Sequence, residues 1–295
     1  MKTRSPLLVT SAVDNSLCVA TVVATQHVRR MRGGSQAQLM RCSDKHFYVV
    51  KFQNNPQHVR VLANEMLATL LAQLAGLPVP SLALVEVSDW MVAHNPQLYI
   101  DRAGCSRPCQ AGLQFGSRYA VDPLAGQVFD FLPEAVLGRV RNLETFAGIL
   151  AVDKWTCNAD GRQAAFWRKM RQRNYAASFI DQGYCFNGGE WTFPDSPLRG
   201  VYAQNEVYAD VLGWDSFEPW LSRIEDMRRD VISAAAAGIP VAWYGGNSSA
   251  LDTLVRTLVE RQSKIRGMLT AFRLSSRRPF PNWGEELQPK AIIIA

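Results

Sequence analysis

The chain has 295 residues, of which 47% are hydrophobic and 20% are charged. This composition is typical of a globular protein with a sizeable core, and it excludes a largely disordered chain. No apolar run is long enough to cross a bilayer, and the apolar stretch near the first residues is too short for a secretory signal. We therefore expect one large domain or two packed lobes, without a membrane partner, in a cytoplasmic protein.

The net charge of +6 raises the question of nucleic-acid binding. The basic residues are dispersed, however, and their small clusters at 29–32, 168–173 and 277–278 lack the interleaved aromatic residues that stack on single-stranded bases. The charge supports a mild preference for anionic ligands, including nucleotide phosphates. Nucleic acid is not an expected partner, and a non-enzymatic nucleic-acid-binding protein is only a third hypothesis.

Cysteine and histidine spacing does not favour a zinc centre or a hydrolytic triad. The closest cysteine pair, Cys105 and Cys109, lacks the two-residue gap of a zinc site and has no second pair. The four histidines show no ligand spacing and no partner serine or cysteine motif. Reduced, mostly buried thiols are the expected state of the six cysteines.

The first half of the chain alternates β-branched runs with breaks. Strands are predicted over 17–28 and 46–52, with a glycine-containing turn between strand candidates. A helix is predicted next, with Asn55 as its N-cap and Pro56 at its first position. Gly76 ends this helix, whose apolar face repeats every four residues at Leu62, Met66, Leu70 and Leu74.

The pattern changes near the Asp122–Pro123 junction, where we expect the lobe boundary. Strand-like runs lie at 82–95, 115–121, 164–169 and 176–183. A helix is predicted over 142–158, and the pattern is helical again beyond about residue 205. The proline-broken tail at 275–295 is expected to run over the surface. A β-rich first part and a mainly helical second part indicate an α+β protein.

A glycine turn, Gly33-Gly34-Ser35-Gln36, lies between two of the predicted strands. Glycines let the backbone turn tightly and approach a ligand, so that N–H groups point at phosphate oxygens. A plain hairpin turn explains the same residues, and the turn alone does not separate the two interpretations.

Lys51 lies inside the apolar run FYVVKF, and Glu65 follows fourteen residues later within the predicted helix. An isolated strand lysine usually points to the solvated face. A strand lysine paired with a glutamate of the following helix is, however, how kinases hold the lysine against the ATP phosphates. The order of glycine turn, strand lysine and helix glutamate is more specific than any one part.

Two aspartates stand where the chain passes between a predicted element and a loop. Asp160 follows the predicted helix in NADGR, and Asp181 ends a strand in SFIDQG. Asp160 is suited to accept the proton of an attacking hydroxyl, and Asp181 is suited to bind Mg²⁺, a hard cation that prefers carboxylate oxygen. Turn aspartates that bond to their own backbone are the alternative.

The ordered set GGSQ, VVKF, NEMLA, NADGR and IDQG resembles the HipA-like kinases, relatives of the eukaryotic protein kinases. The resemblance covers residues from about 30 to 190. It implies a bilobal protein-kinase-like α+β fold with an N-lobe at 1–121 and a C-lobe at 122–295. It also implies that Lys51 contacts phosphate, that Asp160 is the catalytic aspartate and that Asp181 holds the metal.

The chain departs from the kinase pattern at Ala165. Kinases place a metal-binding asparagine five residues after the catalytic aspartate, and the Ala165 methyl group cannot bind Mg²⁺. Gln163 offers an amide oxygen nearby and is the candidate substitute. Asp153 and Asn158 show the five-residue spacing, but they precede the loop, so Asp153 is interpreted as a structural contact.

Arg162 stands where many relatives carry histidine. Its fixed charge is expected either to orient the catalytic aspartate or to meet phosphate. The aromatic- and turn-rich segment at 186–202 fits either an activation-segment equivalent beside the acceptor cleft or a packed irregular loop.

The resemblance favours an ATP- and Mg²⁺-dependent phosphotransferase, with serine or threonine of a protein as acceptor and autophosphorylation as one mode. The adenine would lie near 119–122, against Tyr119 and Val121. A small-molecule hydroxyl acceptor is a variant. The second hypothesis is a catalytically weak pseudokinase that binds nucleotide as a regulatory scaffold. Antitoxin-like or regulatory protein partners occur among relatives, but no residue here identifies one.

Overall fold

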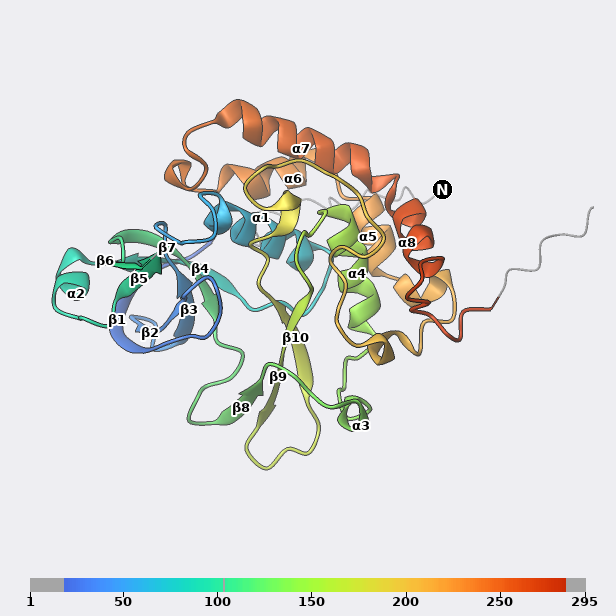
Figure 1. The fold of residues 1–295 in the computed structure, drawn as a ribbon, viewed down its shortest axis with the longest axis horizontal. Coiled ribbons are helices and arrows are strands. Elements are labelled where there is room, and N and C mark those ends of the chain that lie inside the picture. Colours follow the sequence, from blue (N-terminus) through green and yellow to red (C-terminus); the bar gives the residue numbers. More distant parts are fainter. Residues whose placement is uncertain (1–18, 103, 285–295) are drawn as a thin grey trace, which may run out of the picture.

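A five-stranded barrel forms the first part of the computed structural model, which describes residues 19–102 and 104–284. The strands close in the order β1-β2-β3-β7-β4 (Figure 1). Their bounds are β1 (Thr21–Arg30), β2 (Gln38–Cys42), β3 (Phe47–Lys51), β4 (Leu82–Val87) and β7 (Gly112–Arg118). The strands predicted at 17–28, 46–52 and 115–121 thus correspond to β1, β3 and β7, with shifted ends.

Side-chain alternation in β3 separates the barrel interior from the face that carries the lysine. Tyr48 and Val50 belong to the apolar cluster inside the barrel, together with residues of β1, β2 and β4. Because successive strand residues point to opposite faces, Phe47, Val49 and Lys51 share the outer face. Helix α1 lies against this outer face, where it contacts β7.

Helix α1 (Val61–Leu74) is buried along almost its whole length, from Val61 to Ala72. It ends as predicted, because Gly76 adopts φ +82° just beyond it. Its predicted start was wrong. Asn55 does not cap the helix: its Oδ1 accepts from the Gln57 N–H at 2.9 Å, and this local turn delays the first helical residue to Val61.

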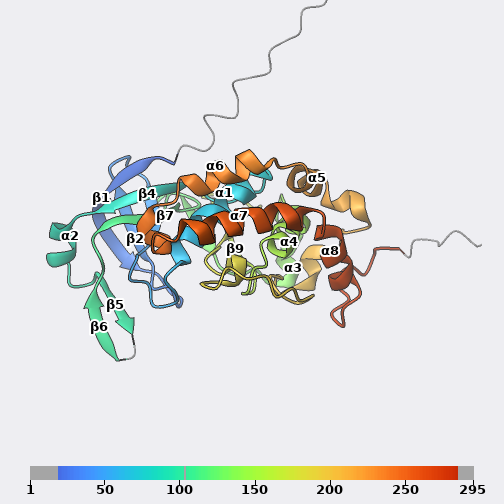
Figure 2. The same ribbon diagram turned by 90° about the horizontal axis from the view of Figure 1, so that it is seen from above.

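The run predicted as one strand at 82–95 divides into β4 and a short helix, α2 (Asp89–Ala93). The Ser88 side chain accepts a hydrogen bond from the Met91 N–H at 3.2 Å and so caps the helix. A hairpin of β5 (Tyr99–Arg102) and β6 (Cys105–Pro108) follows and projects from the barrel (Figure 2).

A second, antiparallel sheet has the strand order β10-β9-β8. Its strands are β8 (Gly126–Phe129), β9 (Gln163–Lys169) and β10 (Ala176–Ile180). Two helices lie between β8 and β9, and after β10 the chain is mainly helical, as predicted. The helices are α3 (Glu134–Leu137), α4 (Thr145–Trp155), α5 (Trp220–Glu225), α6 (Arg229–Ala237), α7 (Ser248–Gln262) and α8 (Ile265–Arg273), with 3₁₀ turns at Cys185–Asn187, Asn205–Tyr208, Trp214–Phe217 and Val241–Tyr244.

The larger apolar core surrounds α4 and extends to α1. Phe146, Leu150 and Trp155 of α4 are fully buried in it, and so are Leu67 and Leu71 of α1. Helix α1, although it follows the barrel strands in sequence, therefore packs into the same core as the later helices. The exact lobe boundary at 121/122 stays a prediction. Within the described ranges, none of the helices has the length and apolar character needed to span a membrane.

The tail prediction was wrong where the structure describes it. Phe280 and Trp283 are buried, and both rings pack against Phe217. The proline-rich sequence breaks the helix, but its aromatic side chains still turn into the core. Residues 285–295 lie outside the described part of the chain.

Gly148 of α4 allows the close approach of a tryptophan. A Cβ atom at this position would lie 2.4 Å from Trp220 Cδ2 and 2.8 Å from Leu77 Cδ2. We predict that Gly148→Ala lowers the free energy of unfolding by up to about 2 kcal/mol, because an overpacking cost of about 1–3 kcal/mol outweighs the gain in helix propensity of about 1 kcal/mol. Denaturant unfolding measures the change.

Gly138→Ala is the matched control, because a Cβ there meets no atom within 4 Å. Equal unfolding midpoints for the two variants would contradict the packing argument.

Candidate functional site

Lys51 is a buried cation between two carboxylates. Its Nζ forms an ion pair with Glu65 Oε1 and a second one with Asp181 Oδ1 at 2.7 Å. The exposed fractions of the Lys51 and Glu65 side chains are only 8% and 3%. The interpretation of Lys51 as an ordinary lysine on a solvated strand face was therefore wrong.

Three segments bring this triad together. Lys51 ends β3 on its outer face, Glu65 lies in the second turn of α1, and Asp181 directly follows β10. Asp181 adopts φ +61°, a left-handed backbone conformation that turns the chain out of the strand. Glu65 Oε2 also accepts from the Gln182 N–H at 3.0 Å, so Glu65 fixes both the lysine and the loop.

Electrostatics favour the charged forms of Lys51 and Asp181, whereas burial raises the pKa of Glu65 above its ordinary value. Burial alone would lower the pKa of Lys51, but the carboxylates of Glu65 and Asp181 outweigh it and raise that pKa above its ordinary value. Burial acts to raise the pKa of Asp181, but the Lys51 ammonium outweighs it and holds that pKa below its ordinary value. Lys51 and Asp181 therefore remain ionised at neutral pH.

The glycine turn lies at the same end of the barrel as Lys51. Gln38, two residues after the turn, pairs with Val50 in the β2–β3 ladder. Gly33 adopts φ +111°, and the Gln36 N–H donates to the Gly33 carbonyl at 3.2 Å. Ser35 is buried, and its carbonyl accepts from Asn55 Nδ2 at 3.0 Å.

A contact between Gln36 and the nucleotide stays a prediction, and its side chain is engaged elsewhere in the protein. The side-chain amide is bonded to the backbone N–H and carbonyl of Asp101, in the β5–β6 hairpin. Both polar atoms of this amide therefore have partners within the protein, and the Gln36 N–H already donates to the Gly33 carbonyl.

Asp160 lies on an exposed loop after α4. Its backbone N–H donates to Asn158 Oδ1 at 3.1 Å, and its own Oδ1 accepts from the Gly161 N–H at 2.8 Å. The Ala159 N–H donates to the Tyr184 carbonyl at 2.9 Å, which ties this loop to the loop that begins at Asp181. The two aspartates thus stand on neighbouring loops, although no hydrogen bond joins them in the described residues.

Arg162 does not behave as predicted. Its buried guanidinium donates to Asp153 Oδ2, Gln182 Oε1 and the Ile180 carbonyl, each at 2.8 Å. These partners occupy the guanidinium in the interior, so it neither orients Asp160 nor faces a phosphate site. Its charge is balanced by Asp153, which is 1% exposed and acts as the structural contact that the sequence indicated.

Ala165 lies in the middle of β9, opposite Ser178 of β10, and is 4% exposed. The position five residues after Asp160 is therefore part of a strand. Gln163 begins β9, is exposed and pairs with Ile180, the residue before Asp181. No cluster of three or more histidine, cysteine, aspartate or glutamate side chains in the described residues is placed to hold a metal.

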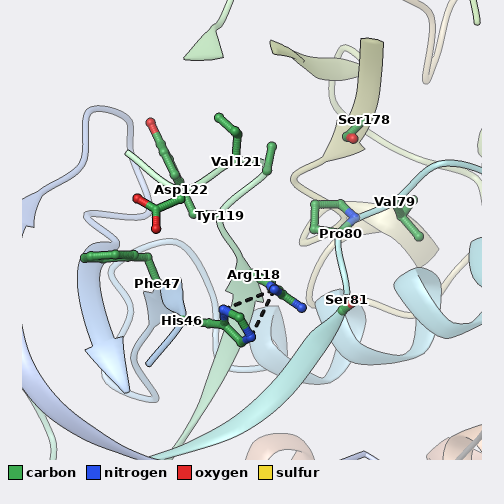
Figure 3. Close-up of a pocket in the computed structure, with 11 residues that line it drawn as sticks. His46, Phe47, Val79, Pro80, Ser81, Arg118, Tyr119, Val121, Asp122 and Ser178 are labelled. Atoms are coloured by element: carbon green, nitrogen blue, oxygen red, sulfur yellow. Dashed lines mark hydrogen bonds between the residues drawn. The ribbon is translucent and has the colours of Figure 1, made fainter. Parts of the chain in front are cut away.

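A cavity of about 420 Å³ lies beside the 119–122 linker (Figure 3). Phe47, Pro80 and Ser178 contribute to its walls, and Arg118 Nη2 lies 3.1 Å from the His46 ring nitrogens at its edge. Tyr119 and Val121 line it, as the expected adenine position requires, whereas Lys51 and Asp181 do not.

The comparisons with known proteins agree with this geometry. A sequence profile described as HipA-like kinase matches residues 24–166. Over these residues, just under half of the chain, the protein is similar to the HipA-like kinases. No curated protein sequence matches the chain.

Solved structures show the fold of this chain over most of its length. The Helicobacter pylori proinflammatory kinase CtkA is 14% identical, with a TM-score of 0.56 over 88% of this chain and 100% of that one. The Golgi casein kinase is 12% identical, with a TM-score of 0.53 over 90% of this chain and 77% of that one. The predicted protein-kinase-like fold is confirmed, and family and fold together support a kinase-type phosphotransferase.

Sequence reasoning missed the polar residues that hold the Asp181 loop. Asn64 Nδ2 lies within 2.9 Å of the carbonyls of Gly183, Cys185 and Gly188. His58 Nε2 lies 2.9 Å from the same Gly183 carbonyl. The sequence did contain a signal for this role. Asn64 lies beside Glu65 in a mainly apolar helix, and a buried side-chain amide needs hydrogen-bond partners.

The segment at 186–202 is irregular and is held by two buried cations. Lys154 Nζ donates to the Pro197 carbonyl at 2.7 Å, and Arg261 forms a two-point contact with Asp195 at 2.7 and 2.8 Å. These contacts fit the packed-loop interpretation. A role of the segment in shaping an acceptor cleft stays a prediction.

The buried Asp153–Arg162 pair should be structural. We predict that Asp153→Ala lowers the free energy of unfolding by about 3–5 kcal/mol, because it leaves the Arg162 charge buried without its carboxylate. Denaturant unfolding followed by circular dichroism checks this value.

Asp230→Ala is the control, since it removes the exposed carboxylate partner of Arg228 and should leave the unfolding midpoint unchanged. A stable Asp153→Ala protein that had lost its enzymatic activity would instead place Asp153 in the catalytic machinery.

Proposed function

We propose that this protein transfers phosphate from ATP to a hydroxyl group with Mg²⁺ as cofactor. The observation that carries the proposal is the buried Lys51 between Glu65 and Asp181. A lysine that is held charged by a helix glutamate is suited to neutralise nucleotide phosphates, and the neighbouring aspartate is suited to the metal. The glycine turn lies at the same end of the barrel and would supply backbone N–H groups.

The distance between the cavity and the lysine suits a nucleotide. Phe47 lines the cavity and shares the outer face of β3 with Lys51, four residues further along the strand. At a rise of about 3.3 Å per residue, the two positions are about 13 Å apart. An adenine beside Tyr119 and Val121 would therefore leave its phosphates near Lys51.

The residues present fit a magnesium ion that is only partly held by protein. Asp181 offers a carboxylate that is 23% exposed, and Gln163, which pairs with Ile180 next to Asp181, offers an amide oxygen. Mg²⁺ usually keeps several waters and binds one or two carboxylates together with substrate phosphates. The bound ion would neutralise charge on the phosphates, so Asp181 would be its main protein ligand.

Asp160 would act on the acceptor. Its carboxylate is exposed, and it stands on the loop that the Ala159–Tyr184 hydrogen bond joins to the Asp181 loop. A hydroxyl placed between the two loops would lose its proton to Asp160 as it attacks the terminal phosphate. Serine or threonine of a protein, including this chain itself, is the acceptor class that the family resemblance favours, in a cytoplasmic setting.

The position of Ala165 favours a second candidate function. Because no asparagine side chain stands at this point, the metal site lacks one of the usual protein ligands. A chain that binds ATP but transfers phosphate slowly would serve as a regulatory scaffold for a protein partner.

Labelling with radioactive ATP separates the two candidate functions. The wild-type protein with ATP and Mg²⁺ should label itself or an added protein, and chelation by EDTA should abolish the label. Asp160→Asn should reduce labelling by about 100-fold or more, the range for a lost general base, while ATP still raises the melting temperature. Absent labelling with a preserved ATP-dependent melting shift would establish the scaffold function instead.

Nucleotide binding depends on the triad in this proposal. Lys51→Met and Asp181→Asn should each abolish the rise in melting temperature that ATP and Mg²⁺ produce, because a phosphate or metal contact is lost. Lys264→Met, at an exposed lysine before α8, is the control and should retain the full rise. Unchanged ATP affinity in folded Lys51→Met would remove the basis of the site assignment.

A further inference from the structure

The glycine turn is attached to the β5–β6 hairpin through one glutamine. Gln36 Nε2 donates to the Asp101 carbonyl at 2.7 Å, and Gln36 Oε1 accepts from the Asp101 N–H at 2.8 Å. The side-chain amide therefore satisfies both backbone groups of a strand residue, as a neighbouring strand would. We call this pair of hydrogen bonds the Gln36 latch.

Arg30 reinforces the Gln36 latch from the end of β1. Its Nη2 donates to Gln36 Oε1, and its Nη1 donates to the Asp101 carboxylate at 3.0 Å. The Arg30 guanidinium also lies over the Tyr99 ring, 4.9 Å from the ring centre. The hairpin, the first barrel strand and the turn thus meet at Gln36.

Backbone hydrogen bonds close the turn itself: the Met31 N–H donates to the Ala37 carbonyl at 2.8 Å, and the Gln36 N–H donates to the Gly33 carbonyl at 3.2 Å. The tip is exposed at Gly33 and Gly34, and a Cβ built on Gly33 meets no atom within 4 Å. On the opposite side, Asn55 Nδ2 donates to the Ser35 carbonyl from the segment that follows Lys51. Asn55 and the Gln36 latch therefore attach the closed turn to the segments on either side of it.

We propose that Gln36 is a positioning residue, which fixes the distance between the glycine turn and the nucleotide phosphates. The β5–β6 hairpin, to which Gln36 is bonded, is thereby part of the nucleotide site. The proposal rests on the proposed ATP-dependent function. Because both amide atoms of Gln36 are occupied, the residue acts through the turn and does not touch the ligand. Loss of the Gln36 latch should weaken binding of phosphate-bearing ligands and leave binding of the base unaffected.

Gln36→Met tests the proposal, because methionine keeps the side-chain volume and removes both hydrogen-bonding atoms. Titration calorimetry with the full chain gives the dissociation constants of ATP with Mg²⁺ and of adenosine, which lacks phosphates. ATP should bind roughly fivefold more weakly, the effect of about one lost hydrogen bond, and adenosine should bind as to wild type. Gln127→Met is the matched control, because Gln127 accepts from Arg168 on the second sheet, away from the turn, and should change neither constant.

The outcomes separate this inference from the proposed function. If wild type binds ATP and folded Gln36→Met binds it equally well, the positioning role is overturned and the proposed function stands. An equal loss for ATP and adenosine would indicate a general structural role and also overturn it. If Gln36→Met does not fold, Gln36→Ala takes its place, and failure of both to fold overturns the positioning role. A wild-type protein that binds neither ligand would overturn the proposed function and this inference together.

Discussion

A lysine cation that has been removed from water is the constraint on which this structure depends. An isolated buried charge costs several kcal/mol, and it is tolerated only where opposite charges approach it closely. Lys51 meets two carboxylates, and Asp181, one of them, lies 130 residues further along the chain. Glu65 of helix α1 supplies one of these carboxylates to the barrel lysine, and the loop after β10 supplies the second. The local chemistry of one side chain couples the two halves of the chain.

Helix α1 transmits this coupling through its packing. Its apolar residues belong to the core that surrounds α4, while Asn64 and Glu65 hold the backbone around Asp181 and Gly183. A helix with a buried polar pair is stable only because each polar atom finds a partner across the interface. The same partners fix the register between α1 and the Asp181 loop, since a shift by one residue would leave them unsatisfied.

The sequence allowed the order of elements and the candidate triad to be predicted, because both depend on local periodicity and on short ordered motifs. Lys51 and Glu65 were paired correctly from their places on a strand and on the helix that follows. The differences arose where the partner of a polar side chain could not be read from the sequence. Asn55 forms a local turn with Gln57 in place of capping a helix, and the sequence is compatible with either role. Arg162 bonds to the buried Asp153 and the Gln36 side chain bonds to the distant Asp101, and nothing in the residues adjacent to these two specifies the partner.

The strand that contains Ala165 also limits which side chains this position accepts. In β9 the side chain at this position lies within the sheet, opposite Ser178, and is almost completely enclosed. An asparagine introduced there would place an amide in the interior, where an unsatisfied polar group is destabilising by about 1–3 kcal/mol. A single substitution at Ala165 is therefore a poor route to an additional metal ligand, and such a ligand would require a different backbone between Asp160 and β9.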